Sequence, residues 1–176
     1  AFIVLALFGR SLPRQGDWLG VLTVTSILGL LIAIFTKTFG AKLPILNAVE
    51  WTNIGNFSLS HGIAVDWITL IMLPVIIIVA LMVNIFSIGY MRGKKEENQT
   101  RFYSYFAIAL GATMGVAYAS NLITLFVFYE ALSLSTYPLV THHQTVAAKR
   151  GGRTYLGVLL STSVVFFLFG IIWVRS

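Results

Sequence analysis

The residue with the most unusual chemistry in this sequence is an acid in the middle of an apolar run. Glu130 lies near the centre of the stretch 122–140, whose other residues are mainly aliphatic, aromatic and hydroxyl-bearing. A carboxylate at the middle of a membrane is costly unless it is paired, hydrated or protonated. Such an acid marks an ion or proton pathway by default, and a structural tie between two helices is the alternative.

Polar side chains continue from this acid on one face of the predicted helix. They follow it at helical spacing and are Ser133, Tyr137 and Thr141. With Glu130 they form a polar stripe that could hold a chain of water molecules. His142 and His143 end the stripe at the predicted cytoplasmic edge, where imidazoles that titrate near neutral pH suit proton uptake. The alternative is that the two histidines are ordinary surface groups.

Other chemistry has little support in this sequence. The absence of cysteine removes disulfides, iron–sulfur ligation and thiol nucleophiles within these residues. His61 is expected on the opposite membrane face from His142 and His143, so one haem cannot use both. No metal or nucleophile constellation is evident, and we expect no cofactor and no redox centre in this chain.

The composition identifies an integral membrane protein. Hydrophobic residues make up 57% of the 176 residues and charged residues only 10%, against about 25% charged in soluble chains. Lys and Arg give a net charge of +6, but they lie in short connections beside apolar runs, where they set topology. We therefore expect a lipid bilayer as the surrounding phase and no nucleic acid as a partner.

The apolar runs predict an all-α fold in a single membrane domain, 1–176, with about six transmembrane helices, the first of them truncated. The expected helices lie near 1–9, 18–35, 66–90, 102–119, 122–140 and 154–174. The external loop 36–65 is expected to contain a small hairpin that turns at Asn53-Ile54-Gly55.

Several polar and glycine residues mark expected helix starts. They are Asp66, Asn98 with Thr100, Ser120-Asn121, and Gly151-Gly152. Gly111 and Gly115 have the spacing with which membrane helices pack closely.

The basic residues predict the orientation. One side would carry nine of them: Arg10, Arg14, Arg92, Lys94, Lys95, Arg101, Lys149, Arg150 and Arg153. The other side would carry three, Lys37, Lys42 and Arg175. The positive-inside rule then places the loops 10–17, 91–101 and 141–153 in the cytoplasm, most simply that of a bacterial cell with this protein in its inner membrane.

Several separated motifs resemble one known family. They are Ser87-Ile88-Gly89-Tyr90-Met91-Arg92-Gly93, Arg101-Phe102-Tyr103, the run from Asn121 to Glu130, and the run from Ser133 to Val140. In this order they resemble the antiporter-like membrane subunits shared by respiratory complex I and the Mrp-type multisubunit cation/proton antiporters. The stretch from Tyr137 to His143 and Gly152-Arg153-Thr154-Tyr155-Leu156 look most similar to the D branch of the Mrp antiporters.

The resemblance implies a fold of about fourteen helices, of which this chain matches the N-terminal part. It implies that a buried glutamate on the fifth helix, matched by Glu130, pairs with a lysine on the seventh, and that Asp66-Trp67-Ile68 begins the third helix. It also implies proton transfer along a hydrated axis, inside a complex with other membrane subunits. The lysine lies outside this fragment, and Thr154 stands where this branch often has a lysine.

Three functional hypotheses follow. The first is translocation of protons, with or without Na⁺, by an antiporter-like subunit in which Glu130 acts with that lysine. The second places the subunit in a complex I-like NADH:quinone oxidoreductase rather than an Mrp antiporter. The third is a structural or assembly fragment that conducts nothing.

Overall fold

Helices stacked side by side and one long β-hairpin make up the structure, a computed structural model that describes residues 2–8, 17–38, 45–54, 57–96 and 98–175. The helices are α1 (Phe2–Phe8), α2 (Asp17–Thr38), α3 (Trp67–Gly93), α4 (Gln99–Tyr118), α5 (Leu122–Val140), α6 (Val146–Thr162) and α7 (Phe169–Arg175). A π-helical segment, η2 (Ser163–Leu168), joins α6 to α7. The strands are β1 (Ile45–Ile54) and β2 (Phe57–Val65).

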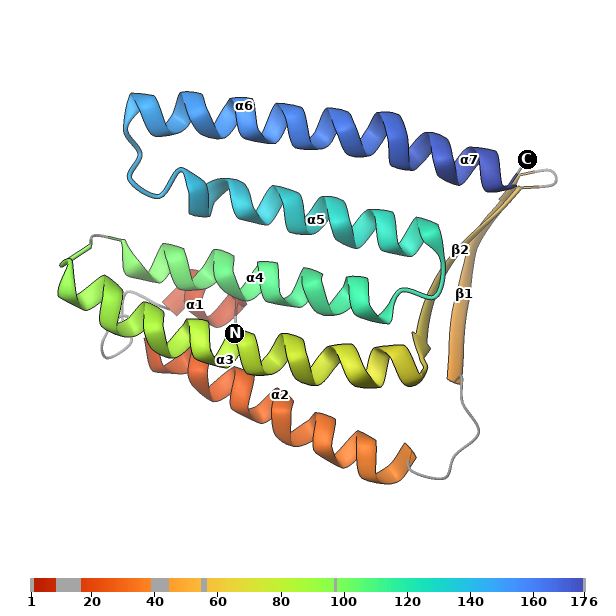
Figure 1. Ribbon diagram of the computed structural model, residues 1–176, viewed down its shortest axis with the longest axis horizontal. Helices are drawn as coiled ribbons and strands as arrows, with labels where there is room; N and C mark the ends of the chain where they lie inside the picture. Colours follow the sequence, from red (N-terminus) through yellow and green to blue (C-terminus); the bar gives the residue numbers. More distant parts are fainter. Residues whose placement is uncertain (1, 9–16, 39–44, 55–56, 97, 176) are drawn as a thin grey trace.

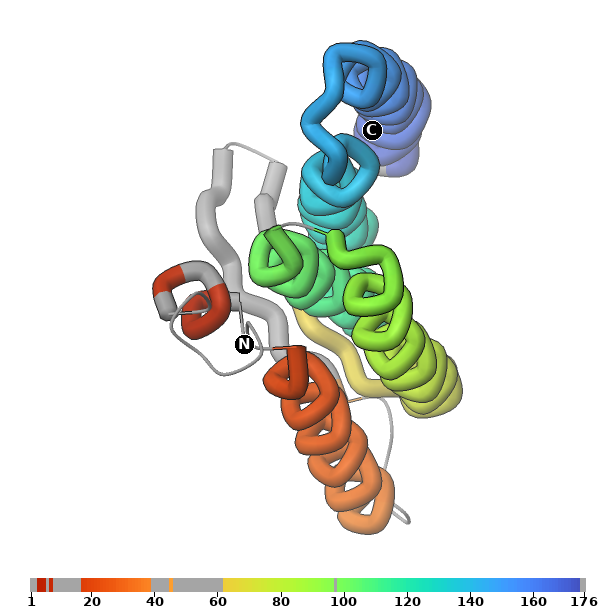
Figure 2. The backbone as a smooth tube through the Cα atoms, turned by 90° about the vertical axis from the view of Figure 1, so that its left-hand side faces the viewer, coloured from red at the N-terminus to blue at the C-terminus, as the bar shows by residue number. Residues whose placement is uncertain are grey.

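The helices form a row in which neighbours in sequence pack against each other (Figure 1). The row runs from α2 through α3, α4 and α5 to α6, and α1 lies to one side against α4 (Figure 2). Leu5 of α1 is fully buried there. The main apolar core lies between α2 and α3, where it includes Val24, Leu31, Leu73 and Ile77.

Within the described residues, four continuous helical segments are long and apolar enough to cross a membrane: 17–38, 67–93, 122–140 and 146–174. The predicted all-α membrane fold is therefore confirmed. Many of their large apolar side chains face outward, as is expected where lipid rather than water surrounds a bundle. The segment corresponding to the predicted fourth span, α4, has the necessary length but is more polar, and it packs between α3 and α5.

Side-chain caps explain two of the predicted helix starts. Asp66 accepts a hydrogen bond from the backbone N–H of Thr69 at 2.7 Å, and Asn121 accepts one from Thr124 at 2.7 Å. Bonds from the backbone and hydroxyl groups of Thr69 also hold the pKa of Asp66 below its usual value of 3.8. Asn98 precedes α4 as predicted, but its backbone is left-handed and its side chain makes no capping bond.

The sixth helix differs from the sequence-based prediction. It begins at Val146 rather than near 154, because Thr145 caps it by accepting a bond from the backbone N–H of Ala148 at 3.1 Å. Gly151-Gly152 therefore lies inside the helix and does not start it.

The loop boundaries change accordingly. The predicted loop 141–153 shrinks to 141–145, and the predicted loop 91–101 shrinks to 94–98 between α3 and α4. The predicted loop 10–17 lies outside the described residues except for Asp17, which begins α2.

The predicted hairpin is confirmed and is longer than expected. Its antiparallel register pairs Ile45 with Val65 and Ile54 with Phe57, with an irregularity between Glu50 and Thr52. The hairpin crosses the end of the row at which α4 meets α5, opposite the α3–α4 and α5–α6 connections (Figure 1).

Hydrogen bonds attach β2 to the turn between α4 and α5. The backbone N–H of Gly62 donates to Thr124 Oγ1 at 3.0 Å, and Ser120 N–H donates to the Gly62 carbonyl at 3.0 Å. A Cβ on Gly62 would lie 1.9 Å from Ser120 Oγ, so only glycine allows this approach.

Candidate functional site

Glu130 lies near the middle of α5 and points toward the helix that follows it. Ser163, the first residue of η2, donates a hydrogen bond from its hydroxyl to Glu130 Oε1. Ser163 is 6% exposed and Glu130 is partly buried. Both residues lie near the middle of their membrane-spanning segments, so this contact is an intramembrane one.

Aromatic side chains pack beside the Glu130–Ser163 contact. The ring of Phe167 in η2 lies 5.7 Å from the ring of Phe126 and 6.3 Å from the ring of Tyr129, centroid to centroid. Both partners belong to α5, so the π-helical segment is held to α5 by a hydrogen bond and two ring contacts. An apolar groove of about 720 Å³ runs beside them, lined by residues that include Tyr129, Thr162 and Ser163.

The polar stripe also faces α6 at the C-terminal end of α5. A Cβ on Gly152 would lie 2.3 Å from Thr141 Cγ2 and 3.2 Å from Tyr137 Cε2, so these side chains contact the glycine backbone. Ser133 and Thr141 are buried, and their hydroxyls donate to backbone carbonyls of their own helix, each at 3.0 Å. Glu130, Tyr137 and Thr141 of the stripe therefore lie at the interface of α5 with α6 and η2.

The two histidines contact another part of the molecule. The ring of His142 packs edge-on against Phe102 of α4 at 5.9 Å and lies 6.0 Å from the ring of His143. His143 is exposed, and its Nδ1 lies 3.7 Å from Glu96 Oε2, an ion pair when the imidazole is protonated. The structure thus brings the histidines to the α3–α4 connection, whereas Tyr137 and Thr141 face α6.

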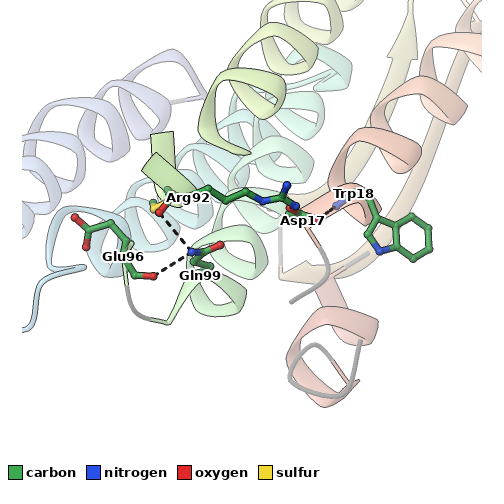
Figure 3. A network of polar contacts seen from close by, with 6 residues as sticks. Asp17, Trp18, Arg92, Glu96 and Gln99 are labelled. Atoms are coloured by element: carbon green, nitrogen blue, oxygen red, sulfur yellow. Dashed lines mark hydrogen bonds and ion pairs between the residues drawn. The ribbon is translucent and has the colours of Figure 1, made fainter. Parts of the chain in front are cut away.

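A second acidic site lies where α2 begins, near the end of α3 (Figure 3). Asp17 is 1% exposed and forms an ion pair with Arg92, whose side chain is 44% exposed. Asp17 also accepts a bond from the backbone N–H of Trp18 at 2.7 Å. Close by, Gln99 donates to the carbonyl of Glu96 at 3.1 Å, which closes the turn between α3 and α4.

Two features of these sites have no clear signal in the sequence. Ser163 is one of two serines in the sixth helix, and its distance from Glu130 along the chain hides the contact. The π-helical turn that begins at Ser163 contains no proline or glycine. The predicted helix bounds, 122–140 and 154–174, would place Glu130 level with residues near 164 in an antiparallel neighbour, so the sequence could have suggested a partner close to Ser163.

Among the residues that the structure describes, no group of three or more His, Asp or Glu side chains could hold a metal ion. The ion pairs in the same part of the chain are Asp17–Arg92 and His143–Glu96, so Glu130 has a hydroxyl partner there and not a cationic one.

A row of apolar helices with a hydrogen-bonded carboxylate near mid-span defines an α-helical integral membrane protein with an intramembrane acid. Residues 119–176 match the family model described as NADH:quinone oxidoreductase/Mrp antiporter, TM. Residues 51–103 match the model described as NADH-ubiquinone oxidoreductase (complex I), chain 5 N-terminus. The chain belongs to this complex I and Mrp antiporter-like family of membrane subunits.

Individual relatives agree with the family. NADH-quinone oxidoreductase subunit L of Neisseria meningitidis (strain Z2491) is 32% identical over 142 residues, which cover 78% of this chain and 21% of the relative. NAD(P)H-quinone oxidoreductase chain 5 of Synechocystis is 30% identical over 92 residues, 52% of this chain and 13% of the relative. NADH-ubiquinone oxidoreductase chain 5 of Dictyostelium discoideum is 27% identical over 149 residues, which cover 81% of this chain and 21% of the relative. The chain spans about a fifth or less of these relatives.

Proposed function

We propose that this chain contributes a proton-translocating step to a multisubunit membrane complex, with Glu130 as the carboxylate that gains and loses the proton. The observation that carries the proposal is the position of this acid. Of the acidic side chains that the structure describes, Asp17, Asp66 and Glu96 lie at helix ends, whereas Glu130 lies within a span. An acid held at mid-span is the kind of group from which intramembrane proton relays are built.

The chemistry requires a partner whose charge responds to Glu130. We propose a lysine ammonium supplied by a helix outside this sequence, as the family resemblance implies, packed near the outer side of α5 and α6. At low dielectric, two charges a few ångströms apart interact strongly enough to change each other's protonation. Loss of a proton from the lysine would then favour proton uptake by Glu130, and proton uptake by the lysine would favour proton loss from Glu130. This mutual dependence is the coupling that a relay needs.

The route between Glu130 and the cytoplasm is part of the same proposal. Ser133, Tyr137 and Thr141 continue from the acid along α5 toward that face, and His142 and His143 stand where α5 ends. The exposed His143 beside Glu96 gives the route a group that exchanges protons with water. Hydration would have to open the α5–α6 interface, because Ser133 and Thr141 are buried and bonded to their own helix.

We propose the inner membrane of a bacterial cell as the location, with the α3–α4 and α5–α6 connections in the cytoplasm. Arg92, Lys94, Lys149 and Arg150 lie in or next to these connections, which supports the orientation through the positive-inside rule.

Two kinds of complex fit this proposal, a complex I-like quinone oxidoreductase and an Mrp-type antiporter in which this chain belongs to the D branch. The names of the relatives above support the former, and the motifs at 137–143 and 152–156 support the latter. Purification of the complex decides between them. Co-purified flavin and iron–sulfur proteins identify the redox pump, and small hydrophobic subunits alone identify the antiporter. Na⁺ as a second transported ion is tested by transport assays with and without it.

The decisive experiment replaces Glu130 by glutamine in the intact complex. The amide keeps the size and the hydrogen bond to Ser163 but cannot titrate, so we expect assembly to survive and most proton transport in vesicles to disappear. Ser135→Ala is the matched control on α5, since the Ser135 hydroxyl donates to the carbonyl of Leu132 at 2.7 Å and not to Glu130. Near-normal proton transport by a well-assembled Glu130→Gln complex would refute the role.

The second candidate function is structural, and the Glu130–Ser163 bond is the observation that favours it. If that bond only ties α5 to η2, Glu130→Gln retains transport and Glu130→Ala lowers the thermal stability of the complex. The two hypotheses therefore predict opposite results for the glutamine variant.

A further inference from the structure

The Ser163 hydroxyl has two hydrogen-bond acceptors within reach. Its hydroxyl donates to Glu130 Oε1, and its Oγ also lies 3.1 Å from the carbonyl oxygen of Leu160. A serine hydroxyl carries a single proton and two lone pairs, so it donates to one of these oxygens at a time and can accept from a third group. The two acceptors are available from the same position of Cβ.

The backbone around Ser163 is as unusual as the side chain. The six residues Ser163–Leu168 are π-helical inside a segment that is otherwise α-helical from Val146 to Arg175. Short π-helical turns are rare and occur frequently at functional sites. This π-helical turn contacts α5 through the hydrogen bond from its first residue, Ser163, to Glu130. The ring of Phe167 adds contacts with Phe126 and Tyr129.

We propose that Ser163 is a positioning residue that serves both protonation states of Glu130, an inference that rests on the proposed function. When Glu130 is ionised, the Ser163 hydroxyl donates to the carboxylate. When Glu130 is protonated, the hydroxyl turns to the Leu160 carbonyl and accepts the carboxylic proton. Neither state then leaves an unpaired polar group in the hydrocarbon region, where such a group is costly.

This arrangement has a mechanical consequence. A proton can arrive at or leave Glu130 with only a rotation of one hydroxyl, while α5 and η2 stay in contact through Phe167. The π-helical turn is what presents Ser163 to Glu130, so the turn and the acid act as one unit. The side chain of Glu130 is thereby kept at one position for its exchange partner.

The experiment compares Ser163→Ala, Ser163→Thr and Thr162→Ala in the intact complex. Ser163→Ala removes the donor to the ionised acid, so the pH midpoint of transport should rise by about one unit, the effect of losing one charge-assisted hydrogen bond. Ser163→Thr keeps the hydroxyl, and its extra methyl has room in the groove that Ser163 lines, so it should restore the midpoint. Thr162→Ala is the control, because the exposed Thr162 hydroxyl donates to the Val158 carbonyl at 2.7 Å.

A second readout keeps the inference separate from the transport role. The infrared carboxylic C=O band of Glu130, identified by its loss in Glu130→Gln, should move to higher frequency in Ser163→Ala. If Glu130→Gln transports normally but Ser163→Ala still moves the band, the proposed function fails and the positioning contact stands. If Glu130→Gln abolishes transport while Ser163→Ala leaves both the band and the pH midpoint unchanged, the positioning role is overturned. Ser163→Cys, a weak donor of similar size, replaces the alanine variant if that variant does not assemble.

Discussion

At Glu130, the Ser163 hydroxyl can offset only part of the free energy that it costs to bury an ionised carboxylate. A hydrogen bond to a charged group contributes about 1.5–3 kcal/mol. Removing a carboxylate from water costs several kcal/mol even after relaxation of the protein. Ser163 therefore offsets part of the cost of an ionised Glu130 and leaves the rest to a proton or a cation. The ionised form keeps a charge that one hydroxyl compensates only in part, and this favours exchange with a proton or a cation.

Asp17 shows the contrasting case, an acid that has its own cation. The structure pairs it with Arg92 across the α2–α3 interface, where the acid is buried and the guanidinium reaches water. Such a pair stabilises a fixed arrangement of helices and has no need of a mobile proton. Asp17 thus has a cationic partner, whereas Glu130 has a hydroxyl partner. For this reason we expect Glu130 to take part in transport and Asp17 to contribute to stability.

We expect Arg92→Gln to destabilise the protein, because it leaves the carboxylate of Asp17 buried and unpaired. The loss should lie between the value of about 1 kcal/mol for exposed ion pairs and the roughly 3–5 kcal/mol for fully buried ones. Asp17→Asn in the same chain should recover part of this loss, giving a positive coupling in a double-mutant cycle measured by thermal unfolding in detergent.

Lys95→Gln is the control for this cycle, since Lys95 is exposed and belongs to the connection that follows Arg92. Additive losses from Asp17→Asn and Arg92→Gln would show that the ion pair does not couple α2 to α3.

At the scale of elements, the fifth helix shows how much of a membrane span can be predicted from sequence. Its bounds, 122–140, are those expected from the apolar run and the preceding Asn121. The predicted start of the sixth helix is wrong because its first two turns, from Val146 to Arg153, contain basic residues and glycines and lack an apolar pattern. The cap at Thr145 is the available signal, whereas the Gly151-Gly152 pair suggests a helix start that the structure does not have.

The hairpin shows a different limit. The prediction of a hairpin is correct, but its predicted turn at Asn53-Ile54-Gly55 lies too early, because Asn53 and Ile54 belong to β1 and pair with Ser58 and Phe57. The broken alternation of residue types also predicts strands shorter than those observed. The register accounts for this break, since Glu50 pairs with Ser60 and Thr52 with Leu59, which leaves Trp51 without a partner residue. An extra residue of this kind reverses the alternation beyond it, and local patterns do not reveal it.

The partner of Glu130 could not be predicted in the same way. Contacts between helices depend on their relative rotation, and the π-helical turn changes that rotation within the sixth span. Spacing alone predicts the stripe on α5, whereas its facing residues, Gly152 and Ser163, required the structure.

The α4–α5 interface supports a prediction about glycine. A Cβ on Gly115 would lie 2.2 Å from Cδ1 of Phe128, whereas a Cβ on Gly111 would have no neighbour within 4 Å. We expect Gly115→Ala to lower stability by about 1–3 kcal/mol through overpacking. Gly111→Ala, one turn away, should be neutral or stabilising, because alanine favours a helix over glycine by up to about 1 kcal/mol.

Thermal unfolding of the two alanine variants in the same detergent measures this difference. Equal stability would mean that Phe128 moves aside without cost and that the predicted close packing of α4 on α5 contributes nothing at Gly115.

At the scale of the whole molecule, the two ends of the helix row differ in structure and in charge. One end carries the hairpin, fixed to the α4–α5 turn through Gly62, Ser120 and Thr124. The other carries the short α3–α4 and α5–α6 connections, with Lys94 and Lys95 in the former and Lys149 and Arg150 in the first turns of α6 (Figure 1). Since basic connections stay in the cytoplasm, this asymmetry predicts how the row crosses the membrane.

Cysteine labelling tests this orientation cleanly, because the 176 residues contain no cysteine of their own. A membrane-impermeant maleimide should modify Lys94→Cys only from the cytoplasmic side and Ser58→Cys, on β2, only from the opposite side. Val79→Cys is the control at mid-span: its side chain is 54% exposed in the absence of lipid, so protection in vesicles shows that a bilayer covers α3. The reverse pattern for Lys94→Cys and Ser58→Cys would invert the orientation. Modification of both from one side would contradict the crossing of the membrane by α3, because a helix of 27 residues at about 1.5 Å each exceeds the hydrocarbon thickness of about 30 Å and must separate its ends.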